Sequence, residues 1–356
     1  MDPKLALVLS GGFVKGAAHI AIAQEMYKRG YVPDVFVGTS IGAVFSVLLG
    51  LYDDPKAVKE ISLKFVKKHI WPRLLSFDPF SKAGLIESRE TVRLIAKAAG
   101  FEGKTFACLK KPVYITATDL NSGKLIVFGP SDRLTARSPS LRSSSLRHGL
   151  KAYSLQPGAV SRKPLAVASG SERAISLSEA LEASISFPVI FKPKKMRIKG
   201  KLMALADGGI RENCPILVAA KVPGVKRILA CDLGYCGQSK GDFNRKNVLD
   251  VFMQCLDLTT SFSQINRYIN DDIFVQNKIS VRIINPGIFD ILPFDLKEIP
   301  AIMDRAAETA DIVFSRFKGP DGLFRYWKKD PFNKKYITVE HIGKRHTNAF
   351  QIVDFS

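Results

Sequence analysis

The feature that most constrains the fold is the stretch Val35–Ala43, which reads Val-Phe-Val-Gly-Thr-Ser-Ile-Gly-Ala. A short β-branched and aromatic run ends in Gly-x-Ser-x-Gly, and an apolar segment of helical length follows to about Tyr52. This pattern predicts a strand, a sharp turn and a helix, with Ser40 at the apex of the turn. The flanking Gly38 and Gly42 let the chain bend tightly and present the hydroxyl at a helix N-terminus, where negative charge is favoured. An ordinary turn can carry the same residues, so this stretch alone leaves both interpretations open.

A second glycine-rich turn follows the first predicted strand, Leu5–Leu9. Residues 10–16 read Ser-Gly-Gly-Phe-Val-Lys-Gly and lead into a predicted helix from Ala17. Strand, loop, helix and strand form a βαβ unit, which predicts a parallel sheet and places this loop beside Ser40. The backbone amides of the loop are suited to bind a phosphate or an oxyanion. A dinucleotide fingerprint is disfavoured, because its second glycine falls at Phe13 and no acidic residue closes the second strand.

Two further local signals lie later in the chain. Val113–Leu120 and Lys124–Phe128 flank the turn Asn121-Ser122-Gly123, which predicts a hairpin. Ser176 and Glu179 predict a capping box at the start of a helix.

A third turn carries the candidate base. The predicted strand Leu202–Ala206 ends in Asp207-Gly208-Gly209, an exposed turn of the kind that carries catalytic groups, although a plain Asp-Gly turn has the same residues. None of the five histidines occupies a comparable position: they are His19, His69, His148, His341 and His346. Asp207 is therefore the residue expected to take the proton of Ser40.

Charge and hydropathy limit the classes of partner. The chain of 356 residues has 53 Lys plus Arg against 33 Asp plus Glu, a net charge of +20, which favours polyanions such as anionic lipid headgroups. No nucleic-acid-binding motif is present, so no nucleic-acid partner is expected. No secretory signal or membrane-spanning run is recognisable, which predicts a cytoplasmic protein with peripheral membrane contact. A basic insertion at about 131–172, without carboxylates from Arg133 to Ser171, is either a solvated loop or a cationic flap that meets anionic membranes.

Taken together, the three motifs resemble those of the patatin-like phospholipases over roughly Leu5 to Ala220. The resemblance implies a three-layer α/β/α fold with a mainly parallel central sheet. It implies a lipid acyl hydrolase of the phospholipase A or lysophospholipase type, acting on phospholipids or other acyl esters without metal or cofactor. It assigns Ser40 as nucleophile and Asp207 as general base. It assigns the oxyanion loop to Gly11, Gly12 and Phe13. The remaining motif residues are structural glycines: Gly16, Gly38, Gly42, Gly208 and Gly209.

One residue departs from the family pattern: Phe13 stands where the family has a third consecutive glycine. A positive φ at this position would strain a phenylalanine, although Phe13 still offers its backbone amide to an oxyanion. The catalytic domain is expected to span residues 1–320, with a C-terminal extension over 321–356. The sequence does not indicate an oligomeric state.

Three alternatives remain open at this point. A Ser-His-Asp carboxylesterase would use His341 or His346 as its base. A catalytically silent lipid-binding module would bind membranes without turnover. A nucleotide-binding protein is disfavoured by the broken glycine fingerprint.

Overall fold

A mixed sheet runs through the molecule, and the computed structural model describes residues 3–67, 88–130, 166–167, 174–188, 190–234, 251–252, 254–260, 273–316, 323 and 337–341. In the described chain the sheet has ten strands, with neighbours in the order β10-β9-β8-β1-β2-β3-β4-β5, and β7 pairs with both β3 and β6. The strands are β1 Lys4–Leu9, β2 Val35–Thr39, β3 Val113–Asp119, β4 Lys124–Phe128, β5 Ala166–Val167, β6 Lys194–Ile198, β7 Lys201–Asp207, β8 Val225–Cys231, β9 Ser280–Asn285 and β10 Ile337–His341.

Most of the strand pairs are parallel. β1 pairs in parallel with β2 and with β8, β2 with β3, β8 with β9, β9 with β10 and β4 with β5. The antiparallel pairs are β3 with β4, β3 with β7 and β6 with β7. The expected α/β fold with a mainly parallel sheet is confirmed, and so is the predicted β3–β4 hairpin.

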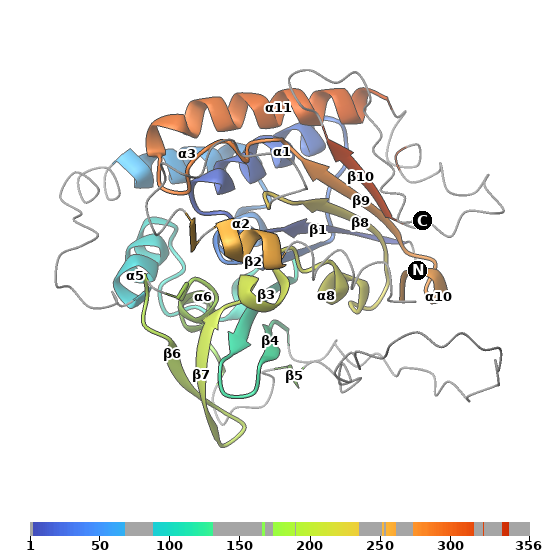
Figure 1. Ribbon diagram of the computed structural model, residues 1–356. Coiled ribbons are helices and arrows are strands. Elements are labelled where there is room, and N and C mark those ends of the chain that lie inside the picture. The colour runs from blue at the N-terminus through green and yellow to red at the C-terminus, as the bar shows by residue number, and fades with distance from the viewer. Residues whose placement is uncertain are drawn as a thin grey trace, which may run out of the picture.

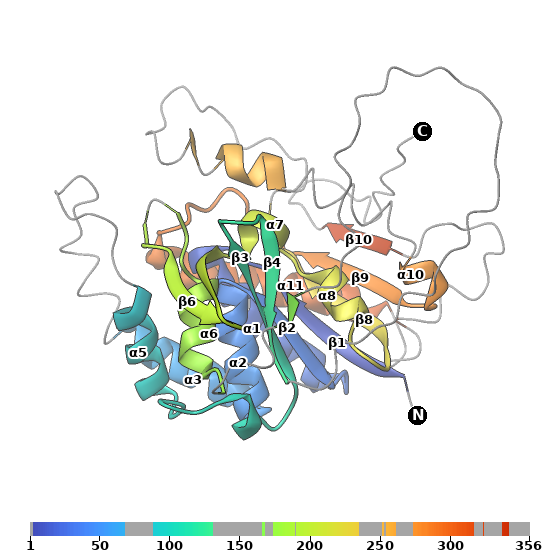
Figure 2. The ribbon, with the colours of Figure 1, turned by 90° about the horizontal axis from the view of Figure 1, so that it is seen from below.

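Helices cover both faces of the sheet (Figures 1 and 2). The longer helices α1, α2, α3, α5, α6 and α11 pack on one face, and the short α8 and α10 pack on the other. The helices, including short and 3-10 turns, are η1 Phe13–Gly16, α1 Ala17–Lys28, α2 Ile41–Tyr52, α3 Pro55–Phe65, α5 Ser88–Ala98, η3 Phe106–Cys108, α6 Leu177–Ser184, α7 Gly209–Glu212, α8 Ile216–Ala220, α10 Ile273–Gln276, η4 Leu296–Glu298 and α11 Ile299–Ser315.

The strand β1 shows why the sheet is covered on both sides. Leu5, Leu7 and Leu9 belong to the core under the long helices, whereas the alternating Ala6 and Val8 belong to the opposite core. A strand buried on both faces reads as a continuous apolar run, as parallel strands in the centre of α/β proteins do. The hydrophobic pattern of this strand therefore identifies it as central.

Local signals predicted several helix ends correctly. The helix after the elbow spans Ile41–Tyr52 as expected. Ser176 and Glu179 form the predicted capping box at the start of α6: each side chain accepts from the other residue's backbone amide.

Two predicted regions fall largely outside the described residues. Within the basic insertion at 131–172, the structure describes only β5, which pairs with β4. Within the expected C-terminal extension, it describes residue 323 and β10, which pairs with β9. The sequence analysis predicted neither β10 nor β6. Part of the expected extension thus joins the edge of the central sheet.

Candidate active site

Ser40 lies at the apex of a sharp strand-to-helix turn, between β2 and α2. Its φ of 54° and ψ of −124° fall in a region that non-glycine residues rarely adopt. The turn is possible because both flanking glycines are in close contact with backbone. A Cβ on Gly38 would lie 2.3 Å from the carbonyl oxygen of Gly42, and one on Gly42 would lie 2.2 Å from that of Leu9. The Gly-x-Ser-x-Gly pattern is therefore a steric requirement of this turn.

The candidate base, Asp207, is the last residue of β7. The expectation that it lies in an exposed turn is wrong: Asp207 is 2% exposed, because it pairs with β3 inside the sheet. Its Oδ1 accepts a hydrogen bond of 2.7 Å from the backbone amide of Gly209. Burial raises the pKa of Asp207 from 3.8 to about 6, and the Ser40 hydroxyl and the Gly209 amide lower it in part. Oδ2 makes no hydrogen bond within the usual geometric limits to the described residues. This oxygen is left available to accept a proton.

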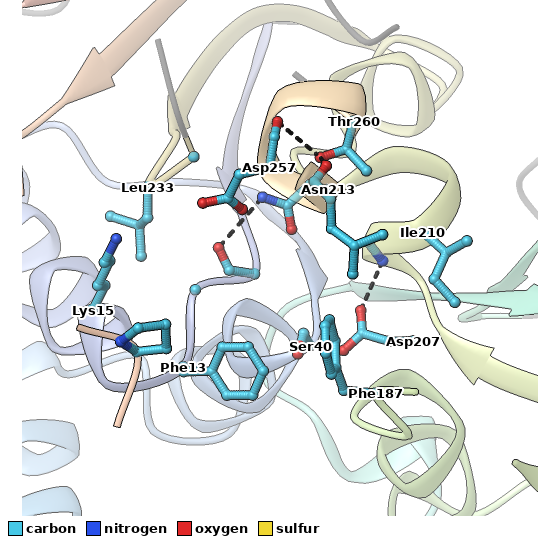
Figure 3. A pocket seen from close by; sticks show the side chains of 16 residues that line it. Phe13, Lys15, Ser40, Phe187, Asp207, Ile210, Asn213, Leu233, Asp257 and Thr260 are labelled. Carbon is cyan, nitrogen blue, oxygen red and sulfur yellow. Dashed lines mark hydrogen bonds between the residues drawn. The ribbon is translucent and has the colours of Figure 1, made fainter. Parts of the chain in front are cut away.

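The strand β3 brings the two residues together. Thr39, the residue before Ser40, pairs with Thr116, and Asp207 pairs with the next residue, Ala117. β2 and β7 thus pair with successive stretches of the same strand. Figure 3 shows the resulting arrangement, with the Ser40 hydroxyl adjacent to the Asp207 carboxylate.

Side-chain hydrogen bonds hold this junction. The Thr39 and Thr116 hydroxyls are 2.5 Å apart, and the Thr118 hydroxyl donates to the carbonyl oxygen of Asp207 at 3.0 Å. A Cβ on Gly208 would lie 2.4 Å from the Thr116 hydroxyl. The glycine that follows Asp207 therefore allows β3 to approach closely.

The expected oxyanion loop follows β1 and is tied to three other parts of the chain. The carbonyl oxygen of Ser10 accepts from Nε2 of His19 at 2.8 Å. The Ser10 hydroxyl donates to the Gly11 carbonyl and accepts from the Leu233 amide at 2.9 Å. The amide of Gly11 donates to the carbonyl oxygen of Asn213 at 3.2 Å. The Gly11 amide is therefore engaged within the fold.

Phe13 adopts the positive φ that its place in the loop suggested, 52°. Its ring packs edge-on against Phe187 at 5.0 Å and against Phe294 at 4.9 Å between centroids. Such edge-to-face contacts are favourable. They offset the strain of a left-handed backbone at a bulky residue. Gly16, at the end of this loop, packs against Ile41, the first residue of α2. The loop and the elbow are thus in direct contact.

A pocket opens above Ser40 and Asp207 (Figure 3). Its walls come from the loop, the elbow, α7 and segments late in the chain, and they include no histidine. The lining residues are Gly11, Gly12, Phe13, Lys15, Ser40, Phe187, Asp207, Gly209, Ile210, Asn213, Leu233, Gly234, Leu256, Asp257, Thr260 and Pro293. The structure therefore brings the three sequence motifs to one cavity.

The residues that support the loop and the elbow lie outside the sequence motifs. His19 is fully buried and hydrogen-bonded to the loop, and burial lowers its pKa from 6.5 to about 4. Asn213 and Ser184 carry no motif signal. His341 lies in β10, separated from β2 by β9, β8 and β1. His69, His148 and His346 lie outside the described residues.

The described residues offer neither a cluster of metal ligands nor a membrane-spanning helix. They contain no group of three or more His, Cys, Asp or Glu side chains arranged to hold a metal ion. None of their helices combines the length and apolar character needed to cross a bilayer.

Several known proteins are similar to part of this chain. An uncharacterised NTE family protein of Mycobacterium tuberculosis is 25% identical over 243 residues, which is 67% of this chain and 51% of the relative. The uncharacterised protein YqhO of Bacillus subtilis is 23% identical over 225 residues, 60% of this chain and 66% of YqhO. The chain spans about half the length of the mycobacterial relative it matches.

Among solved structures, VipD from Legionella pneumophila is similar, with 12% identity and a TM-score of 0.43; the match covers 87% of this chain and 65% of VipD. The family model of the patatin-like phospholipases matches residues 7–220. That range begins in β1, contains the loop, the elbow and Asp207, and ends with α8. With more than half of its length matched, the chain belongs to the patatin-like phospholipase family.

Proposed function

We propose that this protein is a lipid acyl hydrolase that uses Ser40 as nucleophile and Asp207 as general base. The observation that carries the proposal is the strained Ser40 facing a buried carboxylate whose pKa is raised to about 6. At neutral pH this carboxylate is ionised, and it is a stronger base than an ordinary aspartate. The start of α2 favours negative charge on the serine oxygen.

The reaction proceeds in two steps. The Ser40 hydroxyl attacks the ester carbonyl carbon while Oδ2 of Asp207 accepts its proton, and the protonated Asp207 then gives that proton to the departing alcohol. Water next attacks the acyl-enzyme and gives a proton to Asp207. Release of the fatty acid returns that proton to Ser40, which restores the starting state.

The oxyanion is assigned to the amides of Gly12 and Phe13. Gly11 is not included, because its amide donates to Asn213. The carbonyl of Gly11 accepts from the Ser10 hydroxyl, which directs the amide of the same peptide unit, that of Gly12, the opposite way because the peptide bond is planar and trans. Backbone amides fixed before reaction are the usual means of stabilising a tetrahedral oxyanion.

A Ser-His-Asp esterase is less well supported. Of the two histidines in the described residues, His19 is buried and bonded to Ser10, and His341 lies at the far edge of the sheet. Neither lines the pocket. An aspartate occupies the place that a histidine base would take.

Contact with a lipid surface is part of the proposal. Exposed apolar side chains gather on two segments that line the pocket, residues 251–260 and the loop after β9: Val251, Phe252, Leu258, Leu292 and Phe294. An apolar rim with a net charge of +20 suits an anionic membrane. The basic insertion at 131–172, which carries Arg137, Arg142 and Arg147, is proposed to contribute to this membrane contact.

Active-site labelling tests the chemistry. A fluorophosphonate is expected to modify Ser40, as located by peptide mapping, and Ser40→Ala is expected to prevent it. Asp207→Asn should reduce ester hydrolysis by about 10³-fold or more, and the double variant should be little worse, because the two residues act as a unit. Substantial turnover by Asp207→Asn would exclude it as the base, and vesicle binding without labelling or turnover would favour the silent lipid-binding module.

Vesicle sedimentation tests the membrane contact. Phe252→Ser combined with Leu292→Ser should weaken binding to anionic vesicles while hydrolysis of a soluble ester continues, because both side chains are exposed on the rim. Leu202→Ser is the matched control, because Leu202 is 60% exposed on the β6–β7 hairpin and does not line the pocket. Equal binding by the rim variant and the control would remove the rim from the contact surface.

A further inference from the structure

The segment Ser184–Phe187, which begins with the last residue of α6, contacts all three parts of the candidate site. The hydroxyl of Ser184 accepts a hydrogen bond of 2.9 Å from the backbone amide of Ser40. The carbonyl oxygen of Ser186 accepts one of 2.9 Å from the amide of Asp207. The ring of Phe187 packs against Phe13 of the oxyanion loop. A single short stretch thus relates the nucleophile, the base and the loop.

The bond to Ser40 is placed where the backbone needs support. Ser40 has a φ of 54° and precedes the first turn of α2, so its amide has no helical acceptor. Strained residues persist only where the surroundings hold them in place. Within the described residues the Ser184 hydroxyl is the partner of this amide, and Ser184 is fully buried. Water therefore does not readily substitute for it.

The segment is itself held rigidly. α6 begins with the capping box and carries Glu182, whose carboxylate forms a buried ion pair with Lys194. The Ser186 hydroxyl donates to the Glu182 carbonyl at 2.5 Å and is also within hydrogen-bond distance of the Ser88 hydroxyl. A rigid support of this kind is what holds a catalytic constellation in its productive geometry.

We propose that Ser184 is a positioning residue for catalysis: through its hydrogen bond to the Ser40 amide, it holds the nucleophile in line with Asp207. The inference rests on the proposed Ser-Asp hydrolase. Ser184 does not touch substrate, so its removal should reduce kcat and leave KM for a short soluble ester unchanged.

Three variants test the proposal. Ser184→Ala removes the acceptor, Ser184→Thr keeps a hydroxyl, and Ser186→Ala is the matched control. Ser186 is also buried, and among the described residues its hydroxyl is hydrogen-bonded to Glu182 and Ser88 and to none of the catalytic groups. The rate of fluorophosphonate labelling at Ser40 and the kcat for a short ester are measured. Circular dichroism and thermal melting determine the folded fraction of each variant.

Ser184→Ala should react about tenfold more slowly, roughly the factor expected for one net hydrogen bond. Ser184→Thr should recover most of this loss, and Ser186→Ala should stay within about twofold of the wild type. Unchanged rates in Ser184→Ala would overturn the inference. An equal loss in Ser186→Ala would also overturn it, because general loosening of the segment would then suffice.

Hydrogen exchange separates this inference from the proposed function. The Ser40 amide should exchange faster in Ser184→Ala and not in Ser186→Ala, whether or not the protein hydrolyses esters. Absence of labelling in the wild type, together with this exchange pattern, would disprove the hydrolase and retain the Ser184 contact. Unaltered exchange in Ser184→Ala would disprove the contact itself.

Discussion

The nucleophile elbow and the oxyanion loop meet at the same pocket, yet the fold supports them in different ways. Each contains one strained residue, Ser40 with a φ of 54° and Phe13 with a φ of 52°. The elbow depends on close backbone packing, since Gly38 and Gly42 allow the chain to approach itself and Leu9 of β1. The loop depends on distant parts of the chain, because His19, Asn213, Leu233, Phe187 and Phe294 hold it by side-chain or backbone contacts.

A local motif predicts the local turn only. The elbow is recognisable in the sequence because the two glycines that its turn requires stand two positions before and two positions after Ser40. The loop has a recognisable glycine pair, but which of its amides face the pocket is decided by partners elsewhere. Breaking the two regions should therefore have different consequences.

The largest difference is expected between two glycine variants. Gly42→Ala would bring a Cβ within 2.2 Å of the Leu9 carbonyl oxygen, whereas Gly11→Ala would meet the side-chain oxygen of Asn213, which can move. Gly42→Ala should reduce the free energy of unfolding by about 2–4 kcal/mol, within the range of severe overpacking, and Gly11→Ala by about 1 kcal/mol. Urea denaturation measures both, and equal losses would contradict the distinction between rigid backbone packing at the elbow and adaptable side-chain contacts at the loop.

The second prediction concerns pH dependence. Asp207, beside the elbow, titrates, whereas the loop contributes backbone amides, which do not. With the pKa of Asp207 raised to about 6, kcat/KM should fall about tenfold per pH unit below pH 6 and level off above it. A pH profile without an inflection between about pH 5 and 7 would contradict this assignment.

The same ionisation affects stability, with a defined sign. Because the folded pKa lies above the unfolded value of 3.8, the folded state binds the proton more tightly. The free energy of unfolding should therefore fall as pH rises from about 4 to 6. Asp207→Asn removes this penalty and should be more stable than the wild type at pH 7, by on the order of 1–3 kcal/mol. Thermal melting at pH 4 and pH 7 measures the difference, which should disappear at the lower pH.

The third prediction tests the distant support of the loop. His19→Leu removes the donor to the Ser10 carbonyl and should reduce kcat for a short ester about tenfold, with little change in KM. His19→Gln retains an N–H group at a similar reach and should recover much of the activity. If both variants lose activity equally, packing and not the hydrogen bond explains the role of His19.

The smallest effect is expected at Phe13. Phe13→Gly and Phe13→Ala both lose the ring contacts, but only glycine adopts a φ of 52° without strain. The glycine variant should therefore be more stable than the alanine variant by about 1 kcal/mol. Glycine should keep or raise kcat for short esters, and both variants should raise KM for long-chain esters if the ring contacts the acyl chain. Equal stabilities would indicate that the loop relaxes when the ring is removed.

Local sequence patterns were sufficient to predict the central strands, the elbow, the helix Ile41–Tyr52 and the capping box of α6. These features depend on contacts between residues near in the chain: a continuous apolar run, two glycines around a serine, and a serine three positions before a glutamate. The same local signals placed Asp207 at a strand end. Asp207 was then predicted as the base because it is an acidic residue in an Asp-Gly-Gly turn.

The contacts between these elements depend on the tertiary structure. Ser40 and Asp207 are adjacent because β2 and β7 pair with successive residues of β3, and no local pattern encodes that strand order. The same holds for Ser184, which lies 144 positions from the Ser40 amide it binds, and for β10, whose partner β9 lies more than fifty positions earlier. Contacts across such separations are selected by the packing of the whole sheet and its helices, and a single sequence read locally does not contain them.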